Sequence, residues 1–184
     1  MSFNIAIDGP AGAGKSTIAK KIAKELGFVY VDTGAMYRAM ALYFLRSNIS
    51  NEDEQAISRA SENVEITIQY ENGEQQVFLN GENVSGEIRK EEVGNMASKT
   101  SGYGQVRKKL VELQQQLAKK ADVVMDGRDI GTVVLPDAQV KVYLTASVAT
   151  RAKRRYDELS EKGQECNLEK IEADIEQRDY QDMH

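Results

Sequence analysis

Near its amino end the chain reads Gly9-Pro10-Ala11-Gly12-Ala13-Gly14-Lys15-Ser16-Thr17. Residues 9–16 match the pattern G-x-x-x-x-G-K-[ST] at every fixed position. Glycines let successive backbone N–H groups turn toward one concave face, and a helix that follows directs its positive end to the same place. Lys15 adds a mobile charge, and Ser16 adds a hydroxyl that can bind Mg²⁺. The sequence therefore predicts a phosphate-binding loop over residues 9–17, with the metal at Ser16.

Apolar runs on both sides of this loop predict its surroundings. Residues 3–8 (FNIAID) predict a buried strand, residues 16–26 predict a helix with one apolar face, and residues 28–32 (FVYVD) predict a second strand. Strand, loop, helix and strand form a βαβ unit, which indicates an α/β fold with a parallel sheet. A chance glycine-rich turn is the alternative, and this context argues against it.

The rest of the chain predicts further elements of both kinds. Helices are expected at residues 34–46, within 47–63, and at 88–99, 105–120, 149–163 and 168–184. A buried strand is expected at residues 123–126, and a fourth strand is expected at 140–144. Alternating segments at 64–70, 76–79 and 82–84, with turn signals at Asn72-Gly73 and Asn80-Gly81, predict a small antiparallel meander. We expect a core of residues 1–62 and 87–184, and an insertion at 63–86.

The composition excludes several classes of function. The 184-residue chain has a formal net charge of −5, so a chain-wide basic surface for a nucleic-acid polymer is absent. Its single histidine is the last residue, His184, which argues against a catalytic triad or a histidine metal site. We find neither an apolar run long enough for a bilayer nor a signal peptide. The expected location is the cytoplasm, without a membrane partner.

Two polar segments follow predicted strands, at the sheet edge where α/β proteins bind ligands. After the second strand, Asp32 and Thr33 can cap a helix, while Tyr37 and Arg38 lie one turn further on and could hold a base and a phosphate. After the third strand, Asp126 is placed to orient a metal and its waters, and Arg128 could grip a phosphate with two hydrogen bonds. The alternatives are a simple helix cap and a surface turn with a local ion pair.

A basic segment contains Arg151, Lys153, Arg154 and Arg155. A lid around residues 149–165 could bring these charges to the transferred phosphoryl group and exclude water. A solvated basic helix face is the other interpretation.

Over essentially its full length the sequence resembles the bacterial cytidylate kinase (CMP kinase) family. The resemblance rests on IDGPAGAGKST at residues 7–17, DTGAMYR at 32–38, the meander, Val106-Arg107, DGRDIGTVVLPD at 126–137, and Arg178-Asp179. It implies a three-layer P-loop kinase core, ATP with Mg²⁺ as the donor, and CMP or dCMP as the acceptor. We expect a monomer.

The resemblance also implies roles for single residues. Arg154 belongs to the lid, and Lys15, Asp126, Arg128, Asp129 and Arg154 are the expected catalytic residues. The expected acceptor-binding residues are Thr33, Tyr37, Arg38, Ser98, Arg107, Asp126, Arg128, Asp129, Arg178 and Asp182. Family members usually continue past the position of His184 with a further arginine, a strand and a helix, so one C-terminal strand is expected to be missing here.

Other functions remain open at this point. A phosphate-binding loop alone does not separate a kinase from an ATPase, a GTPase or a transporter subunit. A kinase for shikimate, dephospho-coenzyme A or another nucleotide is the nearest alternative. A nucleotide-dependent switch would be expected to have a guanine-reading motif such as N-K-x-D, which this sequence lacks.

Overall fold

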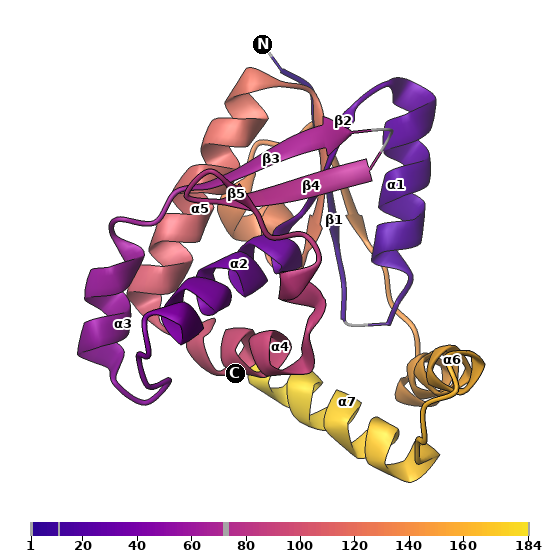
Figure 1. Cartoon of the computed structure of the whole chain (residues 1–184). Coiled ribbons are helices and arrows are strands. Elements are labelled where there is room, and N and C mark those ends of the chain that lie inside the picture. The colour runs from indigo at the N-terminus through magenta and orange to yellow at the C-terminus, as the bar shows by residue number, and fades with distance from the viewer. Residues whose placement is uncertain (1, 11, 72–73, 184) are drawn as a thin grey trace. The chain divides into compact units, whose positions relative to one another are not determined.

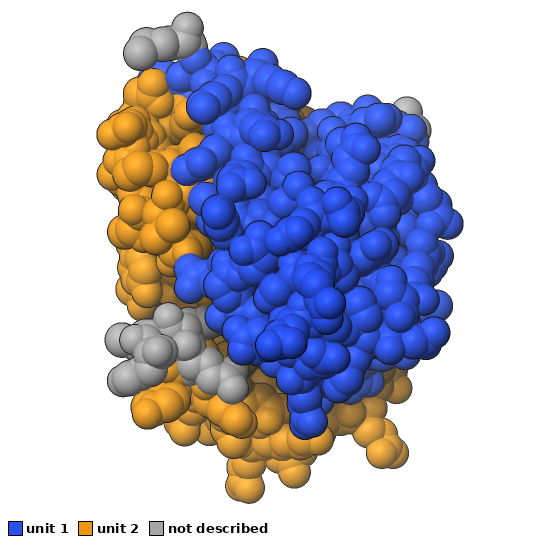
Figure 2. Space-filling model, turned by 90° about the vertical axis from the view of Figure 1, so that its left-hand side faces the viewer, with its two compact units in different colours: residues 1–3, 28–123 blue, residues 4–27, 124–184 orange. Residues whose placement is uncertain are grey.

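The computed structural model describes residues 2–10, 12–71 and 74–183, and it describes residues 181–183 by their backbone alone. The chain divides into two compact units, which Figure 2 shows in blue and orange. Unit 1 comprises Met1–Phe3 and Phe28–Val123, and unit 2 comprises Asn4–Gly27 and Val124–His184. No described helix combines the length and the apolar character needed to span a bilayer.

Unit 2 holds the phosphate-binding loop, and Figure 1 shows its elements in indigo and in orange to yellow. The elements are β1 (Asn4–Asp8), α1 (Lys15–Leu26), β6 (Val123–Gly127), the π-helical turn η2 (Ile130–Val134), β7 (Val140–Tyr143), α6 (Val148–Glu161) and α7 (Leu168–Met183). In the sheet, β1 lies between β6 and β7. Its pairing with β7 is parallel, so the two strands end at the same edge.

The core of unit 2 forms around the central strand β1. Ala6 and Ile7 of β1 are fully buried, as are Val124 and Met125 of β6. A continuous apolar run is what a parallel strand needs when both of its faces are covered. Helix α1 begins after Gly14 and ends at Gly27, whose φ of 71° places it in the left-handed region typical of a helix end.

Unit 1 contains the second strand and the meander. Its elements are β2 (Val29–Asp32), α2 (Thr33–Arg46), α3 (Glu54–Ser61), β3 (Ile66–Glu71), β4 (Glu74–Leu79), β5 (Glu82–Asn83), η1 (Glu87–Arg89), α4 (Glu91–Thr100) and α5 (Gly104–Lys120). Helix α2 packs against α4 and the meander and buries Met36, Met40 and Phe44 completely. The meander is a separate antiparallel sheet in the order β3-β4-β5.

The predicted α/β class, the parallel sheet and the small antiparallel sheet are confirmed. The turn at Asn80-Gly81 is confirmed too, because φ is 48° at Asn80 and 86° at Gly81, as a tight hairpin turn requires. The predicted turn at Asn72-Gly73 lies outside the described residues.

Two predictions of local structure are corrected. A single helix over residues 88–99 is wrong, because Lys90 is extended, with φ −64° and ψ 145°, and separates η1 from α4. The π-helical turn at Ile130–Val134 falls in a segment for which no helix was predicted. In both segments the backbone conformation depends on hydrogen bonds, and the spacing of apolar residues does not reveal it.

Strand β7 stands last in the order of the described sheet. Tyr143 keeps 69% of its surface exposed and Val140 keeps 39%, whereas Ile7 of the central strand is fully buried. An edge position explains this difference between neighbouring strands of one sheet.

Candidate active site

The phosphate-binding loop of unit 2 depends on glycines at three positions. Gly9, Gly12 and Gly14 have φ values of 153°, 77° and 92°. These are backbone conformations that side chains rarely adopt. A Cβ atom at Gly9 would also lie 2.1 Å from the carbonyl oxygen of Leu144, and one at Gly12 would lie 3.1 Å from the Cβ of Arg151. The loop is therefore shaped both by its own backbone and by the elements that close on it.

Lys15 is the first residue of α1, and its side chain bends back over the loop. The ammonium group donates hydrogen bonds to the carbonyl oxygens of Gly9, at 2.6 Å, and of Pro10, at 3.0 Å. Ser16 and Thr17 follow on the first turn of the helix and are exposed. One cation, two hydroxyls and a helix N-terminus thus meet at the loop, which is the chemistry of an anion site.

The segment after β6 provides the acidic and basic groups that the sequence predicts. Asp126 is buried at the end of the strand, Arg128 is exposed, and Asp129 is partly buried. From Asp129 the chain enters the π-helical turn, in which the Leu135 N–H donates to the carbonyl oxygen of Ile130 at 2.6 Å. Turns with this bonding pattern occur often at functional sites.

Asp8 links this segment to the phosphate-binding loop. It is the last residue of β1, directly before Gly9, and it is 8% exposed. Its Oδ1 accepts from the Ile130 N–H and its Oδ2 accepts from the Gly131 N–H, each at 2.8 Å. Sequence reasoning missed this residue. The available signal was an acid ending an apolar strand, directly before the glycine loop.

Helices α6 and α7 are joined by a buried ion pair. Arg151 of α6 is 3% exposed, and its guanidinium donates to both carboxylate oxygens of Asp179 on α7, at 2.9 and 2.5 Å. Its Nε donates to the carbonyl oxygen of Ala146 at 3.0 Å. A guanidinium that binds both oxygens of one carboxylate is held in a fixed orientation.

Electrostatics support the same arrangement. Hydrogen bonds from Arg151 lower the pKa of the Asp179 carboxyl below its ordinary value of 3.8, against the effect of burial, and attraction to Arg128 lowers it further. The hydrogen bonds to Asp179 raise the pKa of the Arg151 guanidinium above its ordinary value.

The other arginines of α6 have different partners. Arg154 is exposed and donates to the carbonyl oxygen of Gly12 at 3.1 Å, so it reaches the phosphate-binding loop. Arg155 pairs with Glu158 of the same helix at 3.4 Å, on the solvent side. The three arginines of the basic segment therefore have different environments, and the lid stays a prediction.

The remaining predicted residues of unit 1 lie on three helices. Thr33 is buried at the start of α2, Tyr37 is partly buried one turn later, and Arg38 is exposed beside it. Ser98 on α4 and Arg107 on α5 are exposed. They come from elements that pack together inside unit 1, α2 with both α4 and α5.

The start of α2 is tied to the meander. The Asp32 side chain accepts from the Ala35 N–H at 3.3 Å and so caps the helix, as the sequence predicts. The backbone N–H of Asp32 donates to the side-chain oxygen of Gln75 on β4 at 3.0 Å. The start of α2, which includes Thr33, Tyr37 and Arg38, is therefore joined to the meander by a hydrogen bond.

The family model described as cytidylate kinase matches residues 5–184. The chain belongs to the cytidylate kinase family. The match begins at the second residue of β1 and takes in the phosphate-binding loop, the meander, the segment after β6, and both C-terminal helices.

Individual cytidylate kinases are similar over nearly the whole chain. The cytidylate kinase of Lactobacillus johnsonii is 53% identical over 182 residues, which are 99% of this chain and 79% of that protein. The one from Caldanaerobacter subterraneus subsp. tengcongensis is 54% identical, covering 99% and 80%. The one from Streptococcus sanguinis is 52% identical, covering 99% and 81%. A solved shikimate kinase from Acinetobacter baumannii, at 18% identity and a TM-score of 0.43, covers 95% of this chain and 74% of that one, a likeness too weak to support an argument.

The structure places several of the residues predicted in unit 2, and their roles stay predictions. Lys15 bends over the loop, and Asp129 belongs to the segment that Asp8 joins to the loop. Arg154 lies on α6 and contacts the loop at Gly12. Arg178 lies next to Asp179 on α7. Ala11 and the side chain of Asp182 lie outside the described part of the structure, so their predicted roles stay predictions.

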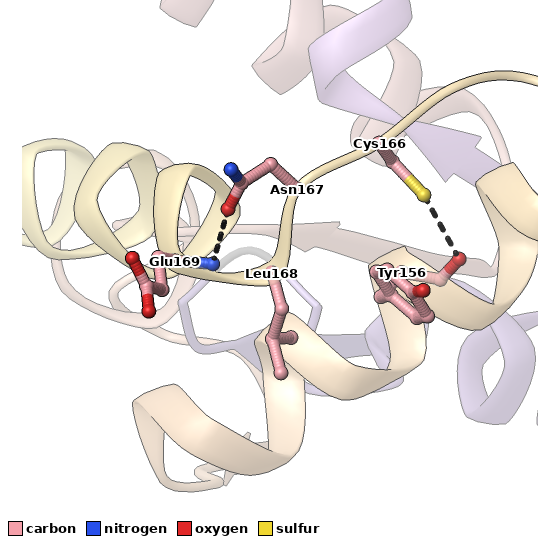
Figure 3. A pocket seen from close by; sticks show the side chains of 5 residues that line it. All are labelled: Tyr156, Cys166, Asn167, Leu168 and Glu169. Atoms are coloured by element: carbon pink, nitrogen blue, oxygen red, sulfur yellow. Dashed lines mark hydrogen bonds between the residues drawn. The ribbon is translucent and has the colours of Figure 1, made fainter.

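One surface hollow of this cytidylate kinase family member lies at the turn between α6 and α7 (Figure 3). It is lined by Tyr156, Cys166, Asn167, Leu168 and Glu169. The Cys166 thiol donates to the carbonyl oxygen of Tyr156 at 3.8 Å. The lining includes an acid and neither lysine nor arginine, so it does not suit a phosphate group.

Proposed function

We propose that the chain transfers the γ-phosphoryl group of ATP to CMP or dCMP, giving ADP and CDP or dCDP. The supporting observation is the geometry of the phosphate-binding loop, with Lys15 and Arg154 on it, in a chain of the cytidylate kinase family. The geometry of the loop supports ATP as the phosphoryl donor, and membership of the cytidylate kinase family supports CMP or dCMP as the acceptor.

The loop is built to receive the phosphates of ATP. The backbone N–H groups of Gly12 and Gly14 and the N-terminus of α1 supply positive dipoles. The Lys15 ammonium, now bonded to two neutral carbonyls, gains stronger charge-assisted hydrogen bonds when it turns to the β- and γ-phosphates. Arg154 is within reach of the same phosphates because it already contacts Gly12.

A kinase of this class uses a divalent cation, and we propose Mg²⁺. Within the described residues, no three His, Cys, Asp or Glu side chains cluster in a way that could hold a metal ion. That fits Mg²⁺, which in kinases takes one or two protein ligands together with phosphates and waters. The exposed Ser16 hydroxyl would be the direct ligand, and the buried Asp126 carboxylate would orient the waters. When bound, the ion neutralises charge on the β- and γ-oxygens.

We propose acceptor-binding roles for the residues that the family resemblance indicates, and we name them for each unit by itself. In unit 1 these are Thr33, Tyr37, Arg38, Ser98 and Arg107. In unit 2 they are Asp126, Arg128, Asp129, Arg178 and Asp182. Arginines suit the acceptor phosphate because their planar guanidinium matches two phosphate oxygens.

Positioning and charge neutralisation supply most of the catalysis. A phosphate oxygen of CMP attacks the γ-phosphorus, and the bond from that phosphorus to the β–γ bridging oxygen breaks as ADP leaves. A dianionic acceptor phosphate needs no strong base, so Asp129 serves to orient the acceptor. Lys15, Arg128 and Arg154 stabilise charge that spreads over the transferred oxygens.

A coupled assay of ADP release over CMP, dCMP, UMP and AMP tests this proposal. We expect CMP and dCMP to be the preferred acceptors and ADP release without an acceptor to be slow. Lys15→Ala should lower turnover on the order of 10²–10³-fold with an unchanged circular dichroism spectrum, while Lys21→Ala, an exposed position of the same helix, should not. The proposal would be refuted if the rate of ADP release did not depend on the acceptor, or if Lys15→Ala kept full turnover. Location in the cytoplasm and a monomeric state are part of the same proposal, and size-exclusion chromatography tests the latter.

A further inference from the structure

The carboxylate of Asp8 joins the two segments of unit 2 to which the chemistry is assigned. It comes directly before Gly9, the first residue of the phosphate-binding loop. Its two bonded partners, Ile130 and Gly131, come directly after Asp129. One side chain therefore sets the separation between the donor loop and the segment that includes Asp126, Arg128 and Asp129.

The hydrogen bonds of Asp8 match a specific need of the π-helical turn. The first N–H groups of any helical turn have no acceptor inside the turn. In unit 2 the missing acceptors come from another strand, because both oxygens of Asp8 accept at 2.8 Å from the first two residues of η2. A capping carboxylate normally belongs to the residue that precedes the helix, and Asp129, which holds that position here, makes no side-chain capping bond.

The surroundings of Asp8 leave little freedom for another arrangement. Asp8 is 8% exposed, and its carbonyl oxygen accepts from the Leu144 N–H at 2.8 Å, which fixes its backbone to the chain after β7. A Cβ at Gly131 would lie 3.3 Å from Oδ2 of Asp8 and 3.3 Å from Cδ of Lys141. The close approach of the turn to the carboxylate therefore depends on glycine at position 131.

We propose that Asp8 is a positioning residue for phosphoryl transfer, which holds the segment of residues 126–131 in register with the phosphate-binding loop. The proposal deepens the function proposed above and rests on it. Asp8 acts through the backbone of Ile130 and Gly131, and it touches neither substrate. Its loss should therefore displace the acceptor-binding residues Asp126, Arg128 and Asp129 more than the donor loop itself.

Asp8→Asn tests the proposal, because the amide keeps the shape but turns an N–H₂ group toward a backbone N–H. A displacement of about 1 Å costs on the order of 100-fold in rate. We expect kcat/KM for CMP to fall by about that factor, while the Kd of ATP–Mg²⁺, measured by calorimetry without acceptor, changes by less than about 3-fold. Amide hydrogen exchange at residues 130–135 should become faster. Asp137→Asn, at an exposed position of the following loop, is the matched control and should keep wild-type constants.

A milder variant covers the case in which Asp8→Asn does not fold. Gly131→Ala places a methyl group 3.3 Å from the same carboxylate oxygen. It should show the same split between CMP and ATP with a smaller loss, about 10-fold for a displacement below 1 Å.

Three results would overturn the proposal. Unchanged kcat/KM for CMP, together with a lower melting temperature, would make Asp8 a purely structural residue. An equal loss of ATP and CMP binding would indicate general damage to the site. If the wild-type chain shows no CMP-dependent ADP release, the proposed function is wrong, and this inference is wrong with it. If the wild type is active and Asp8→Asn is equally active, only the inference is wrong.

Discussion

Loss of the Asp179 carboxylate should destabilise unit 2 by an amount that follows from its contacts. Asp179→Asn removes a charged partner from Arg151, whose side chain is 4% exposed, while the Asp179 side chain is 23% exposed. Removing one member of a fully buried ion pair costs about 3–5 kcal/mol. Because a quarter of Asp179 is open to water, and because Arg151 keeps its bond to the Ala146 carbonyl, we expect about 2–3 kcal/mol.

The assay is thermal unfolding followed by circular dichroism. For a chain of this size each kcal/mol shifts the melting temperature by about 2–4 °C, so the expected loss is about 4–12 °C. Asp174→Asn, at an exposed position of the same helix, is the matched control and should shift it by no more than about 2 °C.

The pH dependence of the melting temperature independently tests whether the charged form of Asp179 stabilises the folded state. Arg151 lowers the pKa of Asp179 below 3.8 in the folded state, so the ion pair adds stability that is present above pH 3.8 and is lost as the pH falls through the folded pKa. The difference in melting temperature between wild type and Asp179→Asn should therefore be constant from pH 8 to about pH 5 and shrink in stronger acid. A loss no larger than that of Asp174→Asn, or one that grows in acid, would refute the reasoning.

Three further substitutions test the loop and the helix that follows it. Gly9→Ala should abolish ATP binding and lower the melting temperature, because its Cβ would lie 2.1 Å from the Leu144 carbonyl oxygen; calorimetry with ATP–Mg²⁺ measures the first effect. Arg154→Ala should lower kcat and raise KM for ATP, the latter by about 10-fold, with an unchanged melting temperature, because an exposed charge near the loop is lost but no core contact. Gly27→Ala should lower stability by about 1 kcal/mol with full activity, because φ at this helix end is 71° while the surrounding space is open.

Matched controls exist for these variants. Gly86→Ala, at a position with φ −78° and open space, should be neutral in binding and stability. Lys153→Ala removes an exposed positive charge one residue before Arg154 and should leave KM for ATP unchanged within about 2-fold. ATP binding by Gly9→Ala, an unchanged KM in Arg154→Ala, or a neutral Gly27→Ala would each contradict the corresponding account.

The order of elements was predictable because it depends on local patterns. The strand–loop–helix–strand unit around residues 9–17 follows from apolar runs and from glycine chemistry, and the meander follows from alternation with turn residues. The helix cap at Asp32 and the glycine end of α1 at Gly27 could also be predicted, because each involves residues a few positions apart.

The missed features depend on partners far apart in the sequence. The π-helical turn receives its N-terminal acceptors from Asp8, more than a hundred residues earlier, so nothing near Ile130 signals it. The basic run of α6 gave no reason to separate Arg151 from Arg154, because the partner that buries Arg151 is Asp179, on another helix. Spacing along one helix identifies which residues share a face but not which of them a distant carboxylate will bury.

The close approach of Arg151 to Gly12 limits how the end of unit 2 can move. A Cβ at Gly12 would be only 3.1 Å from the Cβ of Arg151, and Ala152 beside it is fully buried. The first turn of α6 therefore packs closely against the phosphate-binding loop, and Arg151 also joins it to Asp179 on α7. A motion that carried this turn away from Gly12 would break the close contact and expose Ala152, so we expect any movement during turnover to involve the later part of α6 and the turn at residues 162–167 instead.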